Sequence, residues 1–166
     1  MPNEAHDLMP FSALRAVEHS PPAVVQAPAK LIANQVQSLL RISTPFSIAP
    51  RQIDEVLKPF KPSHQDRHSG LQLVWQRALH IFLQDDALTE AECSYLRRLA
   101  YLFDLSFDDT EVAFRSVVHP RFKAAVAVVM ADSEITAKER NALSVLRSRL
   151  QVERYTSPMN DDLAEP

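Results

Sequence analysis

Two short acidic stretches contain the side chains best suited to bind a cation. The first has Asp85, Asp86 and Glu92, and the second has Asp132, Glu134 and Glu139. Carboxylate oxygens are the ligands that Ca²⁺ and Mg²⁺ prefer, so each stretch is a candidate metal site. An EF-hand loop is excluded, because neither stretch has the central glycine or the twelve-residue ladder of ligands that this motif requires.

The same acids have a second explanation in helix capping. Each stretch ends in a Thr-x-x-Glu segment, Thr89–Glu92 and Thr136–Glu139, which has the form of a capping box. In this motif the threonine hydroxyl accepts from the backbone three residues on, and the glutamate reaches back to the start of the helix. Capping therefore accounts for several carboxylates without a cation, and bound Ca²⁺ or Mg²⁺ stays as an alternative hypothesis.

Two other arrangements could support chemistry. His64 and His68 have the spacing that places two imidazoles on one helical face, but a zinc site needs further ligands and their segment is polar and loop-like. Cys93 lies in the first turn of an expected helix, where a thiolate could act as a nucleophile with His80 or His119 as its base. No third group that would orient the base is evident, so we expect no enzymatic activity.

The composition excludes several classes of function. The chain has 166 residues, a net charge of −3 and no block of Lys and Arg, which disfavours nucleic acid as a ligand. Its single glycine, Gly70, rules out glycine-rich phosphate and dinucleotide loops. Cys93 is the only cysteine, so no intrachain disulfide can form, which fits a cytoplasmic location. We expect no signal peptide and no transmembrane segment, since the longest apolar run, 124–131, is far shorter than the roughly 20 residues of a spanning helix.

Proline divides the chain into two parts of different character. Many of the 12 prolines lie before residue 63, where they confine helices to short segments. We expect a proline-rich, largely irregular arm over 1–29 that contains one short helix. Short helices should follow within residues 30–62, a segment that is a candidate to dock on the core. Residues 63–70 are expected to form a polar loop.

From residue 71 onward, apolar residues recur with sustained helical spacing. This spacing predicts helices before and after each acidic stretch, and a short helix that begins at residue 107 and ends at His119–Pro120. The helix that follows, Arg121–Ala131, is apolar nearly all round, so we expect it at the centre of the core. The acidic tail over 154–166 is expected to be mobile.

An offset of 47 residues aligns two copies of one helix–acidic loop–helix unit. It pairs Trp75 with Phe122, Ala78 with Ala125, Asp85 with Asp132, Thr89 with Thr136, Leu96 with Leu143 and Leu99 with Leu146. Each hairpin is too small to bury its own face, so the two should pack on each other. The predicted fold is therefore all-α, with two repeated αα-hairpins packed as a helical bundle over 71–153. The same offset pairs Cys93 with Arg140, which predicts an exposed thiol.

The two aligned segments resemble a known family. Residues 82–92 (FLQDDALTEAE) and 129–139 (VMADSEITAKE) are similar to the A-D-G-x-I-[ST]-x-x-E signature of TerB-like, or tellurite-resistance B, helical domains. The arrangement is also similar to helical repeats of the large scaffold subunit of the chloroplast inner-envelope import machinery. The resemblance covers about residues 71–153 and implies helical hairpins and, as one alternative, a divalent-cation-binding protein of stress response or membrane-associated complexes. The glycine of the signature is replaced by Asp86 and Ser133, which weakens the expectation of cation-binding loops.

Large aromatic and arginine side chains are typical of protein-binding surfaces. The candidates here are Trp75, Tyr95, Arg97, Arg98, Tyr101, Phe107 and Phe114. The aromatic side chains could equally form the core, and the sequence leaves both interpretations open. The favoured function is a non-enzymatic adaptor module that binds another protein of unknown identity, with a homo-oligomer as a further alternative. The TerB-like cation-binding protein is the second hypothesis, and an enzyme that uses Cys93 is the third.

Overall fold

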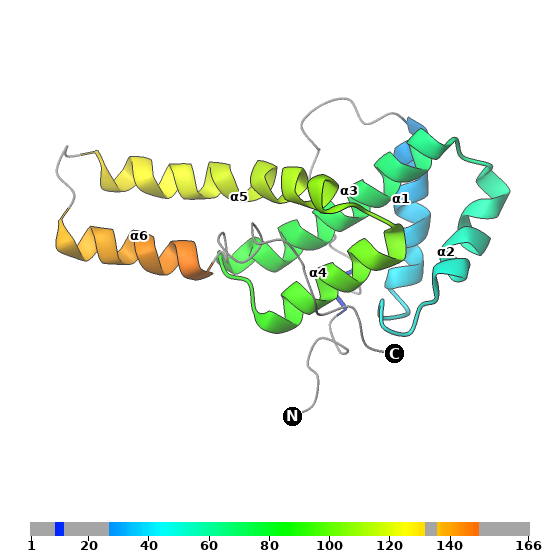
Figure 1. The fold of residues 1–166 in the computed structure, drawn as a ribbon, viewed down its shortest axis with the longest axis horizontal. Coiled ribbons are helices and arrows are strands. Elements are labelled where there is room, and N and C mark those ends of the chain that lie inside the picture. Colours follow the sequence, from blue (N-terminus) through cyan, green and yellow to red (C-terminus); the bar gives the residue numbers. More distant parts are fainter. Residues whose placement is uncertain (1–8, 12–26, 132–135, 150–166) are drawn as a thin grey trace.

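The computed structural model describes residues 9–11, 27–131 and 136–149 (Figure 1). Within these ranges it contains six α-helices and no strand, so the predicted all-α class is confirmed. The helices are α1 (Ala27–Leu40), α2 (Pro50–Leu57), α3 (His64–Phe82), α4 (Glu90–Phe103), α5 (Phe107–Val129) and α6 (Ala137–Arg149), and the 3₁₀ turns η2 (Lys58–Phe60) and η3 (Leu83–Asp85) follow α2 and α3. The sequence also predicted a short helix in the proline-rich segment 1–29 and a mobile acidic tail over 154–166. Most of that helix and all of that tail lie outside the described residues.

Helix α3 is the centre of the core, with α1, α4 and the first half of α5 packed around it. Its Trp75 is fully buried, and the indole Nε1 donates to the carbonyl oxygen of Leu96 in α4 at 3.0 Å. The chain's one glycine, Gly70, lies where α1 crosses α3. A Cβ at that position would lie 2.6 Å from Cγ2 of Ile32, so the absence of a side chain permits the close approach of the two helices. The described residues before residue 62 therefore contribute to the core, with buried side chains from α1, α2 and the loop between them and from Phe11.

Residues 64–70 form the first two turns of α3, so the predicted polar loop is wrong. Ser63 is the N-cap residue, and its Oγ accepts from the backbone N–H of Asp66 at 3.1 Å. The segment is polar because its first turn is largely exposed, and the cap starts the helix well before the first apolar side chain, Leu71. Polarity alone did not distinguish an exposed first turn from a loop.

Helix α5 continues across Pro120, whereas the sequence predicted that one helix ends at this proline and another begins after it. A proline inside a helix removes one hydrogen bond and costs about 3 kcal/mol. Packing on both sides of the proline offsets this cost, because Val117 and Val118 are buried before it and Phe122 contacts the core after it. The guanidinium of Arg121 also holds the helix to the loop that joins α3 and α4.

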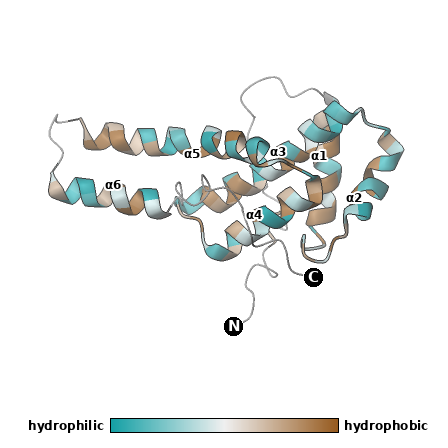
Figure 2. Cartoon of the chain, viewed as in Figure 1, coloured by the Kyte–Doolittle hydropathy of each residue, from teal (hydrophilic) through white to brown (hydrophobic). Residues whose placement is uncertain are grey.

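The second half of α5 and helix α6 form an arm that extends beyond α1–α4 (Figure 1). The prediction that residues 121–131 lie at the centre of the core is wrong, because each of these side chains is half-buried or exposed. The physical reason is length: a helix of 23 residues spans about 35 Å, and the core already filled by α1–α4 contacts only its first half. Figure 2 shows the apolar outer end of α5 in this extended position.

The two hairpins of the sequence repeat have different surroundings. The α3–α4 hairpin is inside the core, whereas the α5–α6 arm reaches it through the partly buried Phe122 and Leu146. The predicted packing of two equivalent hairpins on each other is therefore not confirmed. The apolar face that the first hairpin buries has no equivalent cover on the second among the described residues.

Candidate functional site

The first acidic stretch caps helix α4. Oγ1 of Thr89 accepts from the backbone N–H of Glu92 at 3.2 Å, and Oε2 of Glu92 accepts from the N–H of Thr89 at 2.7 Å. This pair of hydrogen bonds confirms the predicted capping box. Asp85 accepts from the N–H of Ala87 at 3.2 Å, which closes the turn before the cap. Two of the three acids proposed for the first metal site thus bond to backbone N–H groups.

Asp86 occupies the position where the TerB-like signature has a glycine. Its backbone is left-handed, with φ of 56°, and this conformation is the one that glycine adopts without steric cost. Aspartate is one of the few other residues that tolerate it. The side chain accepts from Nη1 of Arg121 at 2.6 Å, and the same nitrogen donates to the carbonyl oxygen of Leu83 at 2.6 Å. The Asp86 carboxylate therefore connects the loop to α5.

The second acidic stretch caps helix α6 in the same way as the first caps α4. Oγ1 of Thr136 accepts from the N–H of Glu139 at 3.2 Å, and Oε2 of Glu139 accepts from the N–H of Thr136 at 2.8 Å, which confirms the second capping box. A hydrogen bond from the Thr136 hydroxyl, followed by one from its N–H, lowers the pKa of Glu139. Asp132 and Glu134, the other acids proposed for this site, lie outside the described residues.

The described part of the chain contains no group of three or more His, Cys, Asp or Glu side chains close enough to share a metal ion. The pair proposed for zinc is on α3, not in a loop. His64 is exposed in the first turn, whereas Nε2 of His68 lies 3.2 Å from Oδ1 of Asp109. One of the two imidazoles is therefore held by a carboxylate from α5.

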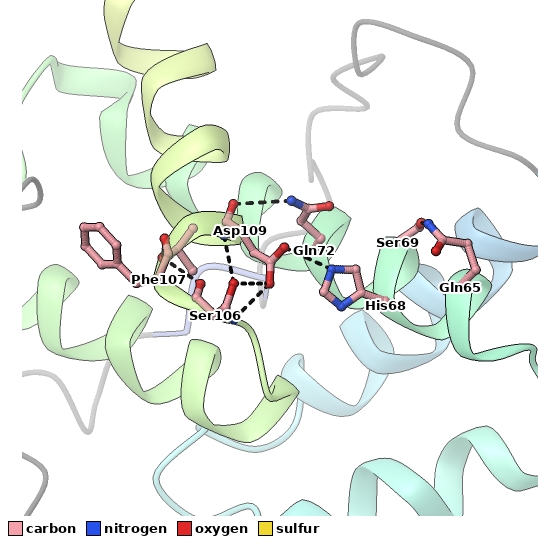
Figure 3. A network of polar contacts seen from close by, with 8 residues as sticks. Gln65, His68, Ser69, Gln72, Ser106, Phe107 and Asp109 are labelled. Atoms are coloured by element: carbon pink, nitrogen blue, oxygen red, sulfur yellow. Dashed lines mark hydrogen bonds and ion pairs between the residues drawn. The ribbon is translucent and has the colours of Figure 1, made fainter. Parts of the chain in front are cut away.

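His68 belongs to a polar network that joins the start of α3 to the start of α5 (Figure 3). The Ser106 hydroxyl donates to Oδ2 of Asp109 at 2.6 Å and accepts from the Asp109 N–H at 3.1 Å, while Gln72 donates to the Asp109 carbonyl at 3.3 Å. The bond from the Ser106 hydroxyl is the main cause of a lowered Asp109 pKa, and nearby His68 contributes to it. Serine, histidine and aspartate meet here, but the hydroxyl bonds to the carboxylate and not to the imidazole. The arrangement caps α5 and does not activate a nucleophile.

Cys93 is buried on the inner face of α4, with 2% of its surface exposed. The prediction of an exposed thiol, which came from its alignment with Arg140, is wrong. The reason is again the unequal surroundings of the two hairpins, since Arg140 lies on the exposed arm. His119, one of the two bases proposed for this cysteine, is exposed on α5. A thiol inside the core cannot meet a substrate in this structure.

Three of the aromatic side chains proposed for partner binding are in the core, namely Trp75, Tyr95 and Phe114. The ring of Tyr95 packs edge-on against Phe82, with centroids 5.3 Å apart. Burial raises the pKa of the Tyr95 hydroxyl above its usual value of 10.0, and the hydroxyl has no hydrogen-bond partner among the described residues. These residues stabilise the fold and cannot contact a partner in this structure.

The arginines proposed for partner binding make contacts within the chain. Nε of Arg98 donates to the carbonyl oxygen of Pro45 at 3.1 Å, and Nη2 donates to that of Ile48 at 3.2 Å. These bonds attach the loop between α1 and α2 to α4. Arg97 forms a partly exposed ion pair with Glu90 at 3.3 Å. Both side chains have structural roles that residue type alone did not indicate.

Two aromatic residues of the proposed set remain accessible. Tyr101 is 55% exposed, and the guanidinium of Arg98 lies 5.0 Å from its ring centroid, within cation–π range. Phe107 is half-buried at the start of α5. Tyr101 and Phe107 are therefore the aromatic residues, among the candidates for partner binding, that a partner could reach in this structure.

Exposed apolar side chains also lie on the α5–α6 arm, part of which the sequence predicted to be core. Val128, Met130 and Val145 are exposed by 77%, 50% and 48%. Beside Pro120 the arm encloses a groove of about 660 Å³, lined by Val118, His119, Pro120, Phe122, Lys123 and Arg147. The sequence signal for this surface is the apolar run 124–131, which the sequence pattern assigned to the core.

Comparison with known proteins identified no relative of this chain. No family model, no curated protein and no solved structure matches the chain. None of the helices in the described ranges is long and apolar enough to cross a membrane.

Proposed function

We propose that this chain is a non-enzymatic adaptor module that binds another protein through the α5–α6 arm. The exposed apolar side chains of the arm are the observation that carries this proposal. Exposed apolar side chains that gather on one part of a domain are typical of interaction sites, and Val128, Met130 and Val145 are all exposed on the arm. The buried thiol and the capped carboxylates give no comparable support to an enzyme.

Substitution of Val128 by Asp tests the proposal. The chain offers a matched control in Val112, which is on the same helix and 65% exposed but lies outside the arm. The full-length protein and its Val128→Asp and Val112→Asp variants are used to co-purify a stoichiometric partner from native extract. The wild type and Val112→Asp should retain the partner, and Val128→Asp should lose it while its circular dichroism stays unchanged. A chain that purifies as a monomer without a partner, or equal retention by both variants, contradicts the proposal.

Binding of a divalent cation is the alternative that the TerB-like resemblance implies. Its candidate ligands are the acids of the two loops, of which Glu92 and Glu139 already accept capping hydrogen bonds. A ligand that binds the folded state raises the melting temperature, so titration with Ca²⁺ and with Mg²⁺ tests this alternative directly. An unchanged melting temperature at millimolar concentrations of either ion would refute it.

A further inference from the structure

The groove beside Pro120 lies where the end of α6 returns alongside the middle of α5 (Figure 1). Its volume of about 660 Å³ is within the range of roughly 300–1,000 Å³ that ligand-binding clefts occupy. Val118, Pro120 and Phe122 supply apolar surface from α5. The groove can therefore take a large apolar side chain of a ligand.

The other described residues that line the groove are basic. His119 and Lys123 come from α5 and Arg147 comes from α6, and no acidic side chain is among the described lining residues. Lys123 is exposed on the second half of α5, and Arg147 lies in the last turn of α6. A ligand seated on the apolar surface would have cationic groups contributed by both helices. The groove is complementary to a ligand that combines apolar groups with negative charge.

Basic residues are also concentrated in the part of the sequence that forms the groove. Residues 119–149 contain six of the 18 Lys and Arg residues and three of the 21 Asp and Glu residues, so this segment is net positive. The rest of the chain has twelve basic and eighteen acidic residues and is net negative. An acidic partner would be attracted to this net positive segment, which contains the lining residues Lys123 and Arg147.

We infer that the groove between α5 and α6 binds an acidic amphipathic peptide segment of a partner protein. An apolar side chain of the segment packs against Phe122, and its carboxylates face Lys123 and Arg147. The apolar contact surface for the segment comes from Val118, Pro120 and Phe122, which line the groove together with the two cationic side chains. This is the helix-in-groove mode of recognition. The inference rests on the proposed function and specifies the chemistry of the partner.

The test measures fluorescence anisotropy of a labelled amphipathic peptide on titration with the full-length protein. The probe has leucine at positions i, i+3, i+4 and i+7 and glutamate elsewhere, and its control has lysine in place of every glutamate. The variants are Lys123→Glu and Arg147→Glu, with Arg140→Glu as the matched control, because Arg140 is exposed on α6 but does not line the groove. The acidic peptide should bind and the basic one should not. Each groove variant should weaken binding by about tenfold, and Arg140→Glu should change it by less than about twofold.

Several results would overturn the inference. Equal binding of both peptides would remove the role of charge, and equal weakening by Arg140→Glu would show a general electrostatic effect without a site. Displacement of the peptide by dodecanoate at similar affinity would assign the groove to a small carboxylate amphiphile. A stable dimer in sedimentation whose formation excludes the peptide would assign it to a second copy of the chain. If Val128→Asp abolishes partner capture while both groove variants retain it, the interaction module stands and this assignment fails.

Discussion

Replacement of Gly70 by Ala tests the packing of α1 against α3. In the middle of a helix, alanine is favoured over glycine by about 1 kcal/mol, so an exposed site would gain stability from this change. At residue 70 the new Cβ would lie 2.6 Å from Cγ2 of Ile32 and 2.8 Å from both the Ile32 Cβ and the Ala29 carbonyl oxygen. Carbon atoms in contact are normally about 3.5–4.0 Å apart, so the overlap is about 1 Å.

The overlap is expected to outweigh the gain in helix propensity. The Ile32 side chain is β-branched and stiff at χ1 in a helix, so it cannot easily rotate away. The second atom in the way is backbone, and it can move only with helix α1 itself. Overpacking of this kind typically costs about 1–3 kcal/mol, and the backbone contact favours the upper end of that range. After subtraction of the propensity gain, Gly70→Ala should lower the free energy of unfolding by about 2 kcal/mol.

The chain has a built-in probe for this measurement. Trp75 is the single tryptophan, it is fully buried, and it lies on α3 about one and a half turns from Gly70. Urea denaturation followed by its fluorescence should show the loss of stability, and the melting temperature should fall by about 4–8 °C for a chain of this size. Ser69→Ala, one residue earlier on the same helix, is the control and should change the free energy of unfolding by less than about 0.5 kcal/mol.

A double-mutant cycle with Ile32→Ala separates the steric effect from other causes. Ile32→Ala removes the Cγ2 atom that the new Cβ would meet, so Gly70→Ala should cost less in that background than in the wild type. If Gly70→Ala instead stabilises the protein by about 1 kcal/mol, helix propensity alone decides the result and the close crossing of α1 and α3 is refuted.

Three further substitutions test polar contacts. Tyr95→Phe should raise the free energy of unfolding by about 1 kcal/mol in urea denaturation, because it removes a buried hydroxyl with no partner among the described residues; a clear loss would reveal a missed hydrogen bond. Asp109→Asn should destabilise at neutral pH. Its folded pKa is lowered, first by the Ser106 hydroxyl, so its contribution is present above the unfolded pKa near 3.8 and disappears as pH falls through the folded value; stability curves that do not converge in acid contradict this. Arg98→Lys should lower the free energy of unfolding by about 1 kcal/mol in thermal unfolding, because lysine cannot replace both hydrogen bonds to the α1–α2 loop. Arg97→Lys is the control and should change the free energy of unfolding by less than about 0.5 kcal/mol, because its ion pair is partly exposed. Equal effects of the two substitutions would refute the structural role assigned to Arg98.

Local features of the fold could be predicted from the sequence because their causes are local. The two capping boxes depend on residues three apart, and both form as the Thr-x-x-Glu spacing predicted. The spacing of apolar residues also located the helices on both sides of each acidic loop. The break predicted at Pro120 failed because burial of Val117 and Val118 by distant segments outweighs the local preference of proline.

The candidate site could not be predicted, because exposure depends on what covers each side chain. Sequence alignment of the two hairpins implied that equivalent residues share an environment. In the structure, Cys93 is buried and Arg140 is exposed. Arg98 has the residue type of a binding hot spot, but it bonds to carbonyl groups about fifty residues away, and no local pattern encodes those partners.

The sequence by itself determined that this protein is helical, where most helices begin, and that a Thr-x-x-Glu pair caps two of them. Hydrogen bonds and side-chain contacts between residues three or four positions apart are fixed once a helix forms. Only the tertiary structure decided which apolar face is covered. The run 124–131 is apolar enough for a core, but α3 and its neighbours fill the core before α5 ends, and this run extends beyond them. Burial is a property of packing between distant segments, and that is why the surface proposed for binding lies where the sequence predicted the interior.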